Sequence, residues 1–176
     1  MRIFIRPITE KDGAHIVKWR NSAKVLKDCM TKKPVTEESH MQYYRERILT
    51  GKNIQFIVER IEEETGLVSY PIATIYLKDV DNENHCCELC VFTSSDIEWE
   101  VESQLLAIKM VLDKAFGEYG IHKVYSRVFY NEGIEVLKSA GFSLESVLKS
   151  EVLINGQYHD IYRLSIFNPK DKVITK

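Results

Sequence analysis

The segments HCCELCVF (residues 85–92), VESQLLAIKMVLDKAFG (101–117) and KVYSRVF (123–129) decide the fold. The outer two are short, mainly apolar runs of the kind that is typical of strands. The middle segment carries apolar residues at the spacing of an amphipathic helix, namely Val101, Leu105, Ile108, Leu112 and Ala115. A strand, a helix and a second strand in succession predict a right-handed parallel crossover.

The residues before this unit begin with a strand and two helices. Residues 2–6 alternate apolar and polar side chains, which predicts a strand. Thr9 is a suitable N-cap for a helix that runs to about Arg20. Thr36 precedes a second predicted helix, which Gly51 is placed to end.

Three strands should then form an antiparallel meander. They are predicted at residues 54–61, 67–78 and 85–92, and short connections join them. A polar turn is expected at residues 63–66. Pro71 lies inside the second strand, which indicates either an edge strand or a β-bulge.

After the crossover, residues 131–140 predict a short helix that ends at Gly141. The dipeptide Asn155-Gly156 is a strong hairpin signal and predicts two final strands around it. We expect one domain over residues 1–168 and a frayed polar tail over residues 169–176.

The composition is that of a globular protein. The 176 residues suffice for one sizeable core, and 44% hydrophobic with 28% charged residues exclude a disordered or collagen-like chain. The near balance of 24 Lys and Arg against 26 Asp and Glu argues against nucleic acid as a partner. We find no secretory signal and no stretch with the ~20 apolar residues of a membrane span, so we expect a cytoplasmic protein without a membrane partner.

Three of the four cysteines crowd one segment, which makes a poor disulfide framework and suggests a reducing compartment. Together with His85 they raise the hypothesis of a zinc site. On a strand, however, His85 and Cys87 face away from Cys86 and Cys90. We therefore expect no metal and interpret the cysteines as small buried hydrophobic residues.

The order of the predicted elements resembles the GNAT superfamily of acyl-CoA-dependent N-acetyltransferases, and several local sequences agree with it. They are Ile5-Arg6-Pro7-Ile8-Thr9 followed by Trp19-Arg20-Asn21, then Glu88-Leu89-Cys90-Val91-Phe92, then residues 107–116 with Gly120-Ile121-His122-Lys123-Val124, and Lys138-Ser139-Ala140-Gly141-Phe142. The first is similar to the branch that acetylates ribosomal-protein N-termini, polyamines and nucleotide-linked amino sugars. The resemblance implies an α/β (α+β) fold, with a mixed, mostly antiparallel twisted sheet of about seven strands flanked by about four helices.

The resemblance also implies a site for acetyl-CoA as co-substrate, in which two neighbouring strands splay apart. The exposed backbone of the first strand would pair with the pantetheine arm, at Val91, Phe92 and Thr93. Backbone N–H groups at the start of the following helix would hold the pyrophosphate, at Glu100, Val101, Glu102, Ser103 and Gln104. Asn131, or Tyr130 in its place, matches the family's asparagine near the pantetheine.

Residues 96–102 depart from the family pattern. The family's phosphate loop normally contains glycines, which reach positive φ and let a phosphate approach the backbone, and none occurs here. The segment instead alternates acidic and apolar residues, which predicts a strand. Its carboxylates would repel a pyrophosphate if they pointed inward. The run could also be a solvated edge or, less simply, a cation site.

Glu88 is the candidate catalytic base. By resemblance it removes a proton from the acceptor amine, through water, and the amine attacks the thioester directly. The alternative for Glu88 is a carboxylate in a structural ion pair. Many family members use a tyrosine to protonate the departing thiolate, but that position is Leu137 here. The candidate proton donors are therefore Tyr125, Tyr130 and bulk water.

The expected acceptor is a primary amine on a small molecule or a peptide N-terminus. Trp19, Arg20 and Asn21 fall in a loop that the resemblance assigns to the acceptor site. The alternative is a core tryptophan followed by an arginine that binds carbonyls at a helix end. Tyr76 and Arg127 are further acceptor-site candidates, because their strands border the cleft. The final hairpin strand offers a surface for a homodimer.

These observations favour an acetyl-CoA-dependent N-acetyltransferase. The competing hypothesis is a non-catalytic GNAT-fold module that has lost normal acyl-CoA binding and binds a ligand or a protein partner. A third hypothesis is an acyltransferase whose different loop geometry accepts an unusual acyl-CoA.

Overall fold

The computed structural model describes residues 2–62 and 68–171. The predicted turn at residues 63–66, the first residue of the strand predicted from Leu67, and the last five residues of the predicted tail (172–176) lie outside the described residues.

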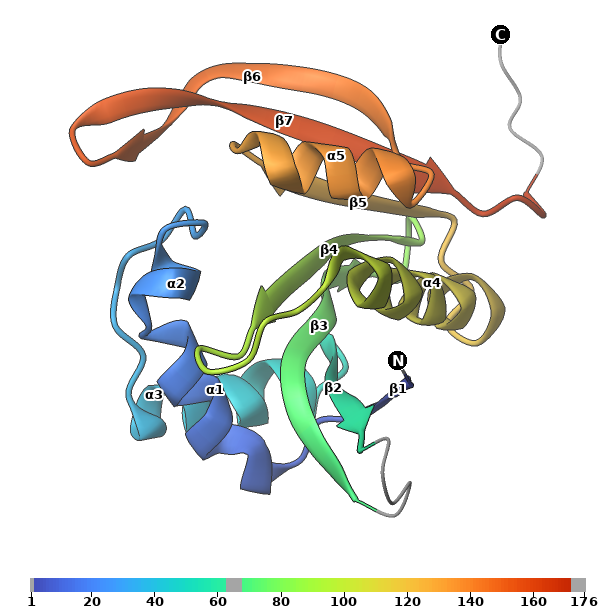
Figure 1. Ribbon diagram of the computed structural model, residues 1–176. Helices are drawn as coiled ribbons and strands as arrows, with labels where there is room; N and C mark the ends of the chain where they lie inside the picture. The colour runs from blue at the N-terminus through green and yellow to red at the C-terminus, as the bar shows by residue number, and fades with distance from the viewer. Residues whose placement is uncertain (1, 63–67, 172–176) are drawn as a thin grey trace, which may run out of the picture.

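The fold is built on one seven-stranded sheet of order β1-β2-β3-β4-β5-β7-β6 (Figure 1). All neighbouring strands are antiparallel except β4 and β5, which are parallel. The strands are β1 (Ile3–Pro7), β2 (Ile54–Ile61), β3 (Ser69–Asp81), β4 (Cys86–Thr93), β5 (Lys123–Val128), β6 (Ser143–Ile154) and β7 (Gln157–Phe167). The predicted mixed, mostly antiparallel sheet is therefore confirmed, including the parallel pair around the long helix.

Helices flank this sheet. They are η1 (Glu10–Asp12), α1 (Gly13–Arg20), α2 (Ala23–Leu26), α3 (Glu37–Tyr43), the π-helical turn η2 (Tyr44–Ile48), α4 (Val101–Gly117) and α5 (Asn131–Ser139). The predicted cap at Thr9 is present, since its backbone N–H donates to the Asp12 carboxylate at 2.8 Å. The sequence analysis missed α2, a single turn that Ser22 caps by accepting the Val25 N–H.

Pro71 sits at a β-bulge in an interior strand. Strand β3 lies between β2 and β4, so the edge-strand alternative for Pro71 is wrong. The register with β2 shifts between Val58 and Glu59, opposite Pro71 and Ala73. A bulge interrupts the ladder where proline has no N–H to donate.

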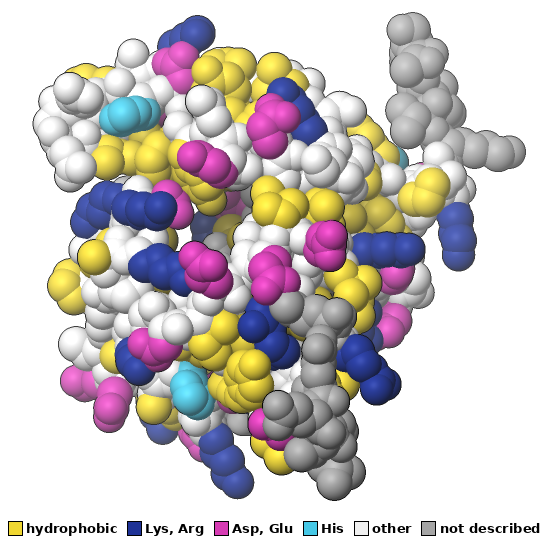
Figure 2. Space-filling view, viewed as in Figure 1, with side chains coloured by type: hydrophobic (Ala, Val, Ile, Leu, Met, Phe, Trp, Pro, Cys, Tyr) yellow, Lys and Arg dark blue, Asp and Glu magenta, His cyan; other side chains and the backbone are white. Residues whose placement is uncertain are grey.

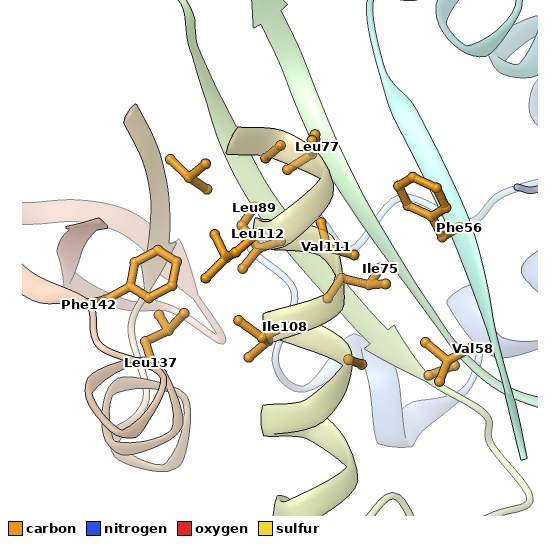
Figure 3. Close-up of a cluster of buried hydrophobic side chains, with 14 of the residues drawn as sticks. Phe56, Val58, Ile75, Leu77, Leu89, Ile108, Val111, Leu112, Leu137 and Phe142 are labelled. Atoms are coloured by element: carbon orange, nitrogen blue, oxygen red, sulfur yellow. The ribbon is translucent and has the colours of Figure 1, made fainter. Parts of the chain in front are cut away.

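Two apolar clusters lie on opposite faces of the sheet. The larger one packs α4 and α5 against the strands, and Figure 3 shows Ile108, Val111 and Leu112 of α4 turned toward the sheet. The smaller one packs α1 against the sheet through Ile16 and Trp19. The predicted face of α4 is right for Ile108, Leu112 and Ala115, whereas Leu105 is only partly buried and Val101 is 54% exposed at the helix N-terminus.

The strand predicted from the acidic and apolar alternation at residues 96–102 is wrong. Residues 94–100 form a loop, and Val101 begins α4. Trp99 is 7% exposed within the large core, and Ile97 packs against that core, while the alternating Asp96, Glu98 and Glu100 are exposed. The alternation thus comes from a loop that anchors every second side chain, and no strand of residues 2–62 and 68–171 pairs with it.

The chain ends with the long β6–β7 hairpin, which extends beyond β5 in Figure 1. Its turn is Asn155-Gly156 as predicted, with φ of 51° and 80°, the left-handed values of a two-residue hairpin turn. Asn168 then donates its backbone N–H to His122 O at 2.8 Å. Within the described residues, no helix is both long enough and apolar enough to cross a membrane.

Candidate active site

Strands β4 and β5 separate partway along their length. Their parallel ladder runs only from Cys86 opposite Lys123 to Glu88 opposite Tyr125. Beyond that point β4 continues to pair with β3 as far as Thr93, and β5 pairs with β7 as far as Val128. The two central strands therefore open into a V, which is the splay that the resemblance implies.

The backbone of β4 faces into this opening at alternate residues. Ser94 donates its N–H to Ile72 O at 2.8 Å, which places Ser94 and every second residue before it toward β3. The N–H and C=O groups of Leu89, Val91 and Thr93 then point the other way, toward β5. Consistent with this, Leu89 O accepts the Ser126 hydroxyl at 2.9 Å. Val91 and Thr93 lie past the end of the β4–β5 ladder.

A pocket of about 460 Å³ occupies this opening on the α4 and α5 side of the sheet. Figure 2 shows its mouth as a hollow near the centre of the view, with basic and acidic side chains around it. Its inner wall is apolar and includes Leu89, Ile108, Val128, Val136 and Leu137. Its rim is polar and includes Lys24, Lys27, Asp28, Glu98, Glu100 and Glu132.

Most of the predicted cofactor residues line this pocket, and three do not. Those that do are Val91, Phe92, Thr93, Glu100, Val101 and Gln104. Glu102 is exposed outside the pocket lining, and Ser103 is buried. Asn131 is exposed at the start of α5, whereas its neighbours Tyr130 and Glu132 line the pocket.

The N-terminus of α4 opens onto the pocket. Glu100 is its N-cap, and the Glu100 side chain does not cap the helix. The Gln104 side chain donates to Trp99 O at 2.7 Å and so fixes the approach to the helix. A 17-residue helix that presents its first turn in this way is a favourable place for an anion.

Lysines of the opposite wall hold the 94–100 loop in place. Lys24 donates to Ser94 O at 3.2 Å and to Ile97 O at 2.9 Å. Lys18 forms an exposed ion pair with Asp96 at 2.6 Å. Lys24 thus satisfies two carbonyl groups of the loop, and Lys18 pairs with one of its carboxylates.

Glu88 lies at the apex of the V, on the face away from α4. Its carboxylate accepts two hydrogen bonds from Arg127, at 2.8 and 3.0 Å, and one from Lys78 at 3.2 Å. The Glu88 side chain is 5% exposed, and those of Arg127 and Lys78 are about one-third exposed. The hydrogen bonds to Glu88 raise the pKa of Arg127. These contacts are those of a structural ion pair, which was the alternative interpretation of Glu88.

The two tyrosine candidates lie on different faces. Tyr125 lies opposite Glu88 in the ladder, with the Arg163 guanidinium 3.9 Å from its ring centroid. Burial and the nearby Glu88 raise the pKa of Tyr125, while Arg163 opposes that shift. Tyr130 lines the pocket itself, and burial, followed by Asp28, raises its pKa to about 12.

The predicted acceptor loop is anchored to the body of the protein. Trp19 is 2% exposed in the small core. Arg20 donates to Thr31 O at 2.8 Å. Asn21 donates its side-chain N–H to Val35 O at 2.7 Å and accepts the Val35 N–H at 2.8 Å. Arg20 and Asn21 thus hold the segment after α2, which carries the pocket residues Asp28 and Cys29.

Tyr76 joins Glu88 and Arg127 on the face away from α4. It pairs with Cys90 across the ladder and packs edge-on against Phe92. Burial, followed by Glu88, raises the pKa of the Cys90 thiol to about 12, so the thiol is protonated at neutral pH. Within the described residues, no group of three or more His, Cys, Asp or Glu side chains is placed to hold a metal ion.

Sequence reasoning missed the lysines and one arginine of this site. Lys24 lies in the unpredicted α2 and Lys27 directly follows it, and both line the pocket. Lys78 and Arg163 reach the apex from β3 and β7, and only strand order reveals that. The Ser22 cap was the one sequence signal that could have revealed α2.

Comparison with known proteins identifies the family. The model of the acetyltransferase (GNAT) domain matches residues 5–162. Spermidine N(1)-acetyltransferase of Escherichia coli K12 is 24% identical over 165 residues, which cover 93% of this chain and 84% of that protein. A probable N-acetyltransferase of Bacillus subtilis, YjcK, is 35% identical over 68 residues, 38% of each chain.

Solved structures show the same fold. The spermidine N-acetyltransferase of Vibrio cholerae in complex with CoA and spermine superimposes with a TM-score of 0.85 at 19% identity, over 96% of each chain. A dodecameric structure of spermidine N-acetyltransferase from the same organism has a TM-score of 0.78 at 20% identity, over 96% of this chain and 95% of that one. At these identities the likeness concerns the fold.

Proposed function

The chain belongs to the GNAT acetyltransferase family, and on that premise we propose how its residues carry out acetyl-CoA-dependent N-acetylation of an amine. One observation carries the proposal. The pocket of about 460 Å³ joins the free backbone edge of β4 to the N-terminus of α4, which has no side-chain cap. A long ligand with a peptide-like arm and an anionic end needs this combination.

The residues of the pocket fit acetyl-CoA, which supplies the acetyl thioester. Val91 and Thr93 offer backbone N–H and C=O groups to the pantetheine amides, as a strand edge does for a peptide. The first turn of α4, from Glu100 to Gln104, offers N–H groups and the positive end of the helix dipole to the pyrophosphate. Lys24 and Lys27 add positive charge at the rim.

Glu88 is the proposed base, through water, for the acceptor amine. Its position at the apex of the V supports this role, since the strands part there. Arg127 and Lys78 hold its two oxygens in fixed positions. For the thiolate, Tyr130 is a donor on the pocket wall, and its raised pKa keeps the phenol protonated at neutral pH. Tyr125 is the alternative donor from the other face.

The acceptor is an amine, and we propose a primary amine on a small molecule or a peptide N-terminus. Arg20, Asn21 and Trp19 support the acceptor site by holding the segment after α2. The relatives named for spermidine act on a small-molecule amine. We also propose a homodimer through the β6–β7 hairpin, and a cytoplasmic location, which suits the four free thiols.

Two measurements test this function. Acetyl-CoA at 100 times its Kd should raise the free energy of unfolding by about 2.7 kcal/mol. Absence of any thermal shift at millimolar acetyl-CoA would contradict acyl-CoA binding. Amines of different charge are then tested for release of CoA. If acetyl-CoA binds but none of these amines releases CoA, the result would favour the non-catalytic module.

Glu88→Gln tests the base. We expect kcat to fall about 100-fold or more, with little change in acetyl-CoA affinity because Glu88 lies outside the pocket lining. A steady-state pH profile and a thermal melt are measured together. An unaltered kcat with a lowered melting temperature would assign Glu88 to the ion pair alone.

A further inference from the structure

The face of the sheet away from α4 is the side from which an acceptor reaches the apex of the V. The pocket proposed for acetyl-CoA fills the α4 and α5 side of the opening. Two reactants that meet in direct attack have to approach the same point from different directions. The side chains around that point on the opposite face therefore face the acceptor, and they include Lys78, Glu88, Tyr125, Arg127 and Arg163.

Positive charge exceeds negative charge on this acceptor face. Glu88 is shared between Arg127 and Lys78, and Glu145 is shared between Lys123 and Arg163. Asp79 is shared between Arg47 and Lys78, the latter at 3.4 Å. Five cations thus face three carboxylates in these pairs, which leaves a surplus of two positive charges.

Around Glu88 the cations are the accessible partners, whereas Glu145 is as exposed as Arg163, at 34% against 35%. The side chains of Lys78, Arg127 and Arg163 are 35–36% exposed, whereas Glu88 is 5% exposed. A molecule that approaches the apex therefore meets ammonium and guanidinium groups before it meets the Glu88 carboxylate.

Two arginines stand directly opposite one another on this face. Arg127 of β5 and Arg163 of β7 are register partners, so their side chains leave the sheet side by side. Like charges in such a pair are destabilising. Glu88 neutralises Arg127, but Arg163 has only a 3.3 Å contact to Glu145 and stacks over Tyr125, and its Nε lacks a hydrogen-bond partner among the described residues.

We propose that the acceptor carries an acidic group, a carboxylate or a phosphate, which binds to Arg163 while the amine of the same molecule reaches the apex, with Lys78 adding positive charge on the same face. This inference rests on the proposed function and adds the chemical class of the acceptor. A bidentate guanidinium contact suits either anion. A polyamine, by contrast, would bring several positive charges to a face that already has a surplus.

Matched amines that differ by one acidic group test the proposal. The probes are O-phosphoethanolamine with ethanolamine, glycylglycine with glycylglycinamide, and spermidine. Binding is measured calorimetrically on the full chain, with and without CoA, so a failed CoA site does not hide a preference of the acceptor face. We expect at least one acidic amine to bind about 10-fold more tightly than its neutral partner, and spermidine to bind weakly.

Variants locate the preference. Arg163→Gln should reduce the acidic-to-neutral binding ratio about 10-fold. Arg163→Lys should retain part of this ratio. Lys78→Gln should reduce the same ratio independently of Arg163. Lys114→Gln changes a partly exposed lysine in the last turn of α4, on the other side of the sheet, and should leave the ratio unchanged. Equal binding of both members of each pair, no binding by either acidic amine, tighter binding of spermidine, or a ratio insensitive to Arg163 and Lys78 would each overturn the proposal.

Discussion

Gly133 shows how one residue shapes the pocket wall. It lies in the first turn of α5, beside the ring of Tyr130. A Cβ at position 133 would lie 2.7 Å from Tyr130 Cε2, where ordinary contact begins at 3.4 Å. Tyr130 can keep its place on the pocket wall because residue 133 has no side chain.

Gly133→Ala should weaken acetyl-CoA binding without unfolding the protein. The Tyr130 ring has to retreat by roughly 0.7 Å, and a displacement of that size in a reacting site typically costs about 10-fold or more. Alanine favours the helix by about 0.5–1 kcal/mol, which offsets part of the strain. The KM for acetyl-CoA and the melting temperature are measured together.

Gly117→Ala is the matched control, because it is also a helical glycine but has no atom within 4 Å of its Cβ position. It should leave the KM for acetyl-CoA unchanged. Equal KM values for Gly133→Ala and the unaltered protein would show that the Tyr130 position does not matter for the cofactor.

At the scale of an element, the 94–100 loop and the start of α4 replace a glycine-rich phosphate loop. The loop is held by Lys24 through two carbonyl groups and by its buried Trp99. The carboxylates of Glu98 and Glu100 point to solvent but still line the pocket mouth. The outward orientation limits their repulsion of a pyrophosphate without abolishing it.

Glu98→Gln and Glu100→Gln should each tighten acetyl-CoA binding. Removing one charge about 6 Å from a phosphate in water gains about 0.7 kcal/mol, or about 3-fold in Kd. Titration calorimetry at low ionic strength measures the gain, which should shrink at high salt.

Glu102→Gln is the control for these two variants, because Glu102 lies one residue into α4 but outside the pocket lining. Its effect on Kd should stay below that of either loop variant. If all three variants leave Kd unchanged, the pyrophosphate does not bind beside this loop.

At the scale of the whole molecule, the β6–β7 hairpin leaves apolar side chains without cover. Leu144, Leu153 and Tyr158 are 53%, 56% and 69% exposed, and Leu153 lies opposite Tyr158 in the ladder. Leu144 lies at the other end of the hairpin, whereas Leu153 and Tyr158 form one exposed apolar pair beside the turn, and an exposed apolar patch is typical of an interface. This observation supports the homodimer proposed above.

Leu153→Asp should convert the dimer to a monomer, because it buries a charge in the proposed interface. Light scattering after size exclusion gives the mass directly. Leu49→Asp is the control, since Leu49 is 66% exposed after η2, away from the hairpin, and should leave the mass unchanged. A monomeric unaltered protein would rule out the dimer.

The local predictions came true where neighbouring residues alone decide the structure. Helix α4 has a three- and four-residue apolar period, the Thr9 cap closes on Asp12, and Asn155-Gly156 reaches left-handed φ values with little strain. The strand predicted at residues 96–102 is wrong because the period of two in this segment comes from anchoring Ile97 and Trp99 in the core. The sequence pattern does not distinguish that loop from a strand.

The residues of the candidate site also divide into those that the sequence could place and those that required the structure. Val91, Thr93 and the start of α4 could be placed in advance, because backbone groups at a strand edge and a helix end need no particular side chain. Tyr130 was one of three open choices until its place on the pocket wall was known. The cofactor-binding, catalytic and acceptor roles of these residues stay predictions.

Periodicity, caps and turns in the chain are sufficient for most of the elements and their order, because each depends on residues a few positions apart. The charge of the acceptor face depends on strand order instead. Lys78, Glu88, Arg127 and Arg163 come from four strands, and they meet only because β7 lies beside β5 and β4 lies between β3 and β5. Electrostatic interactions act over ångströms of space, so only the tertiary structure decides which charges meet.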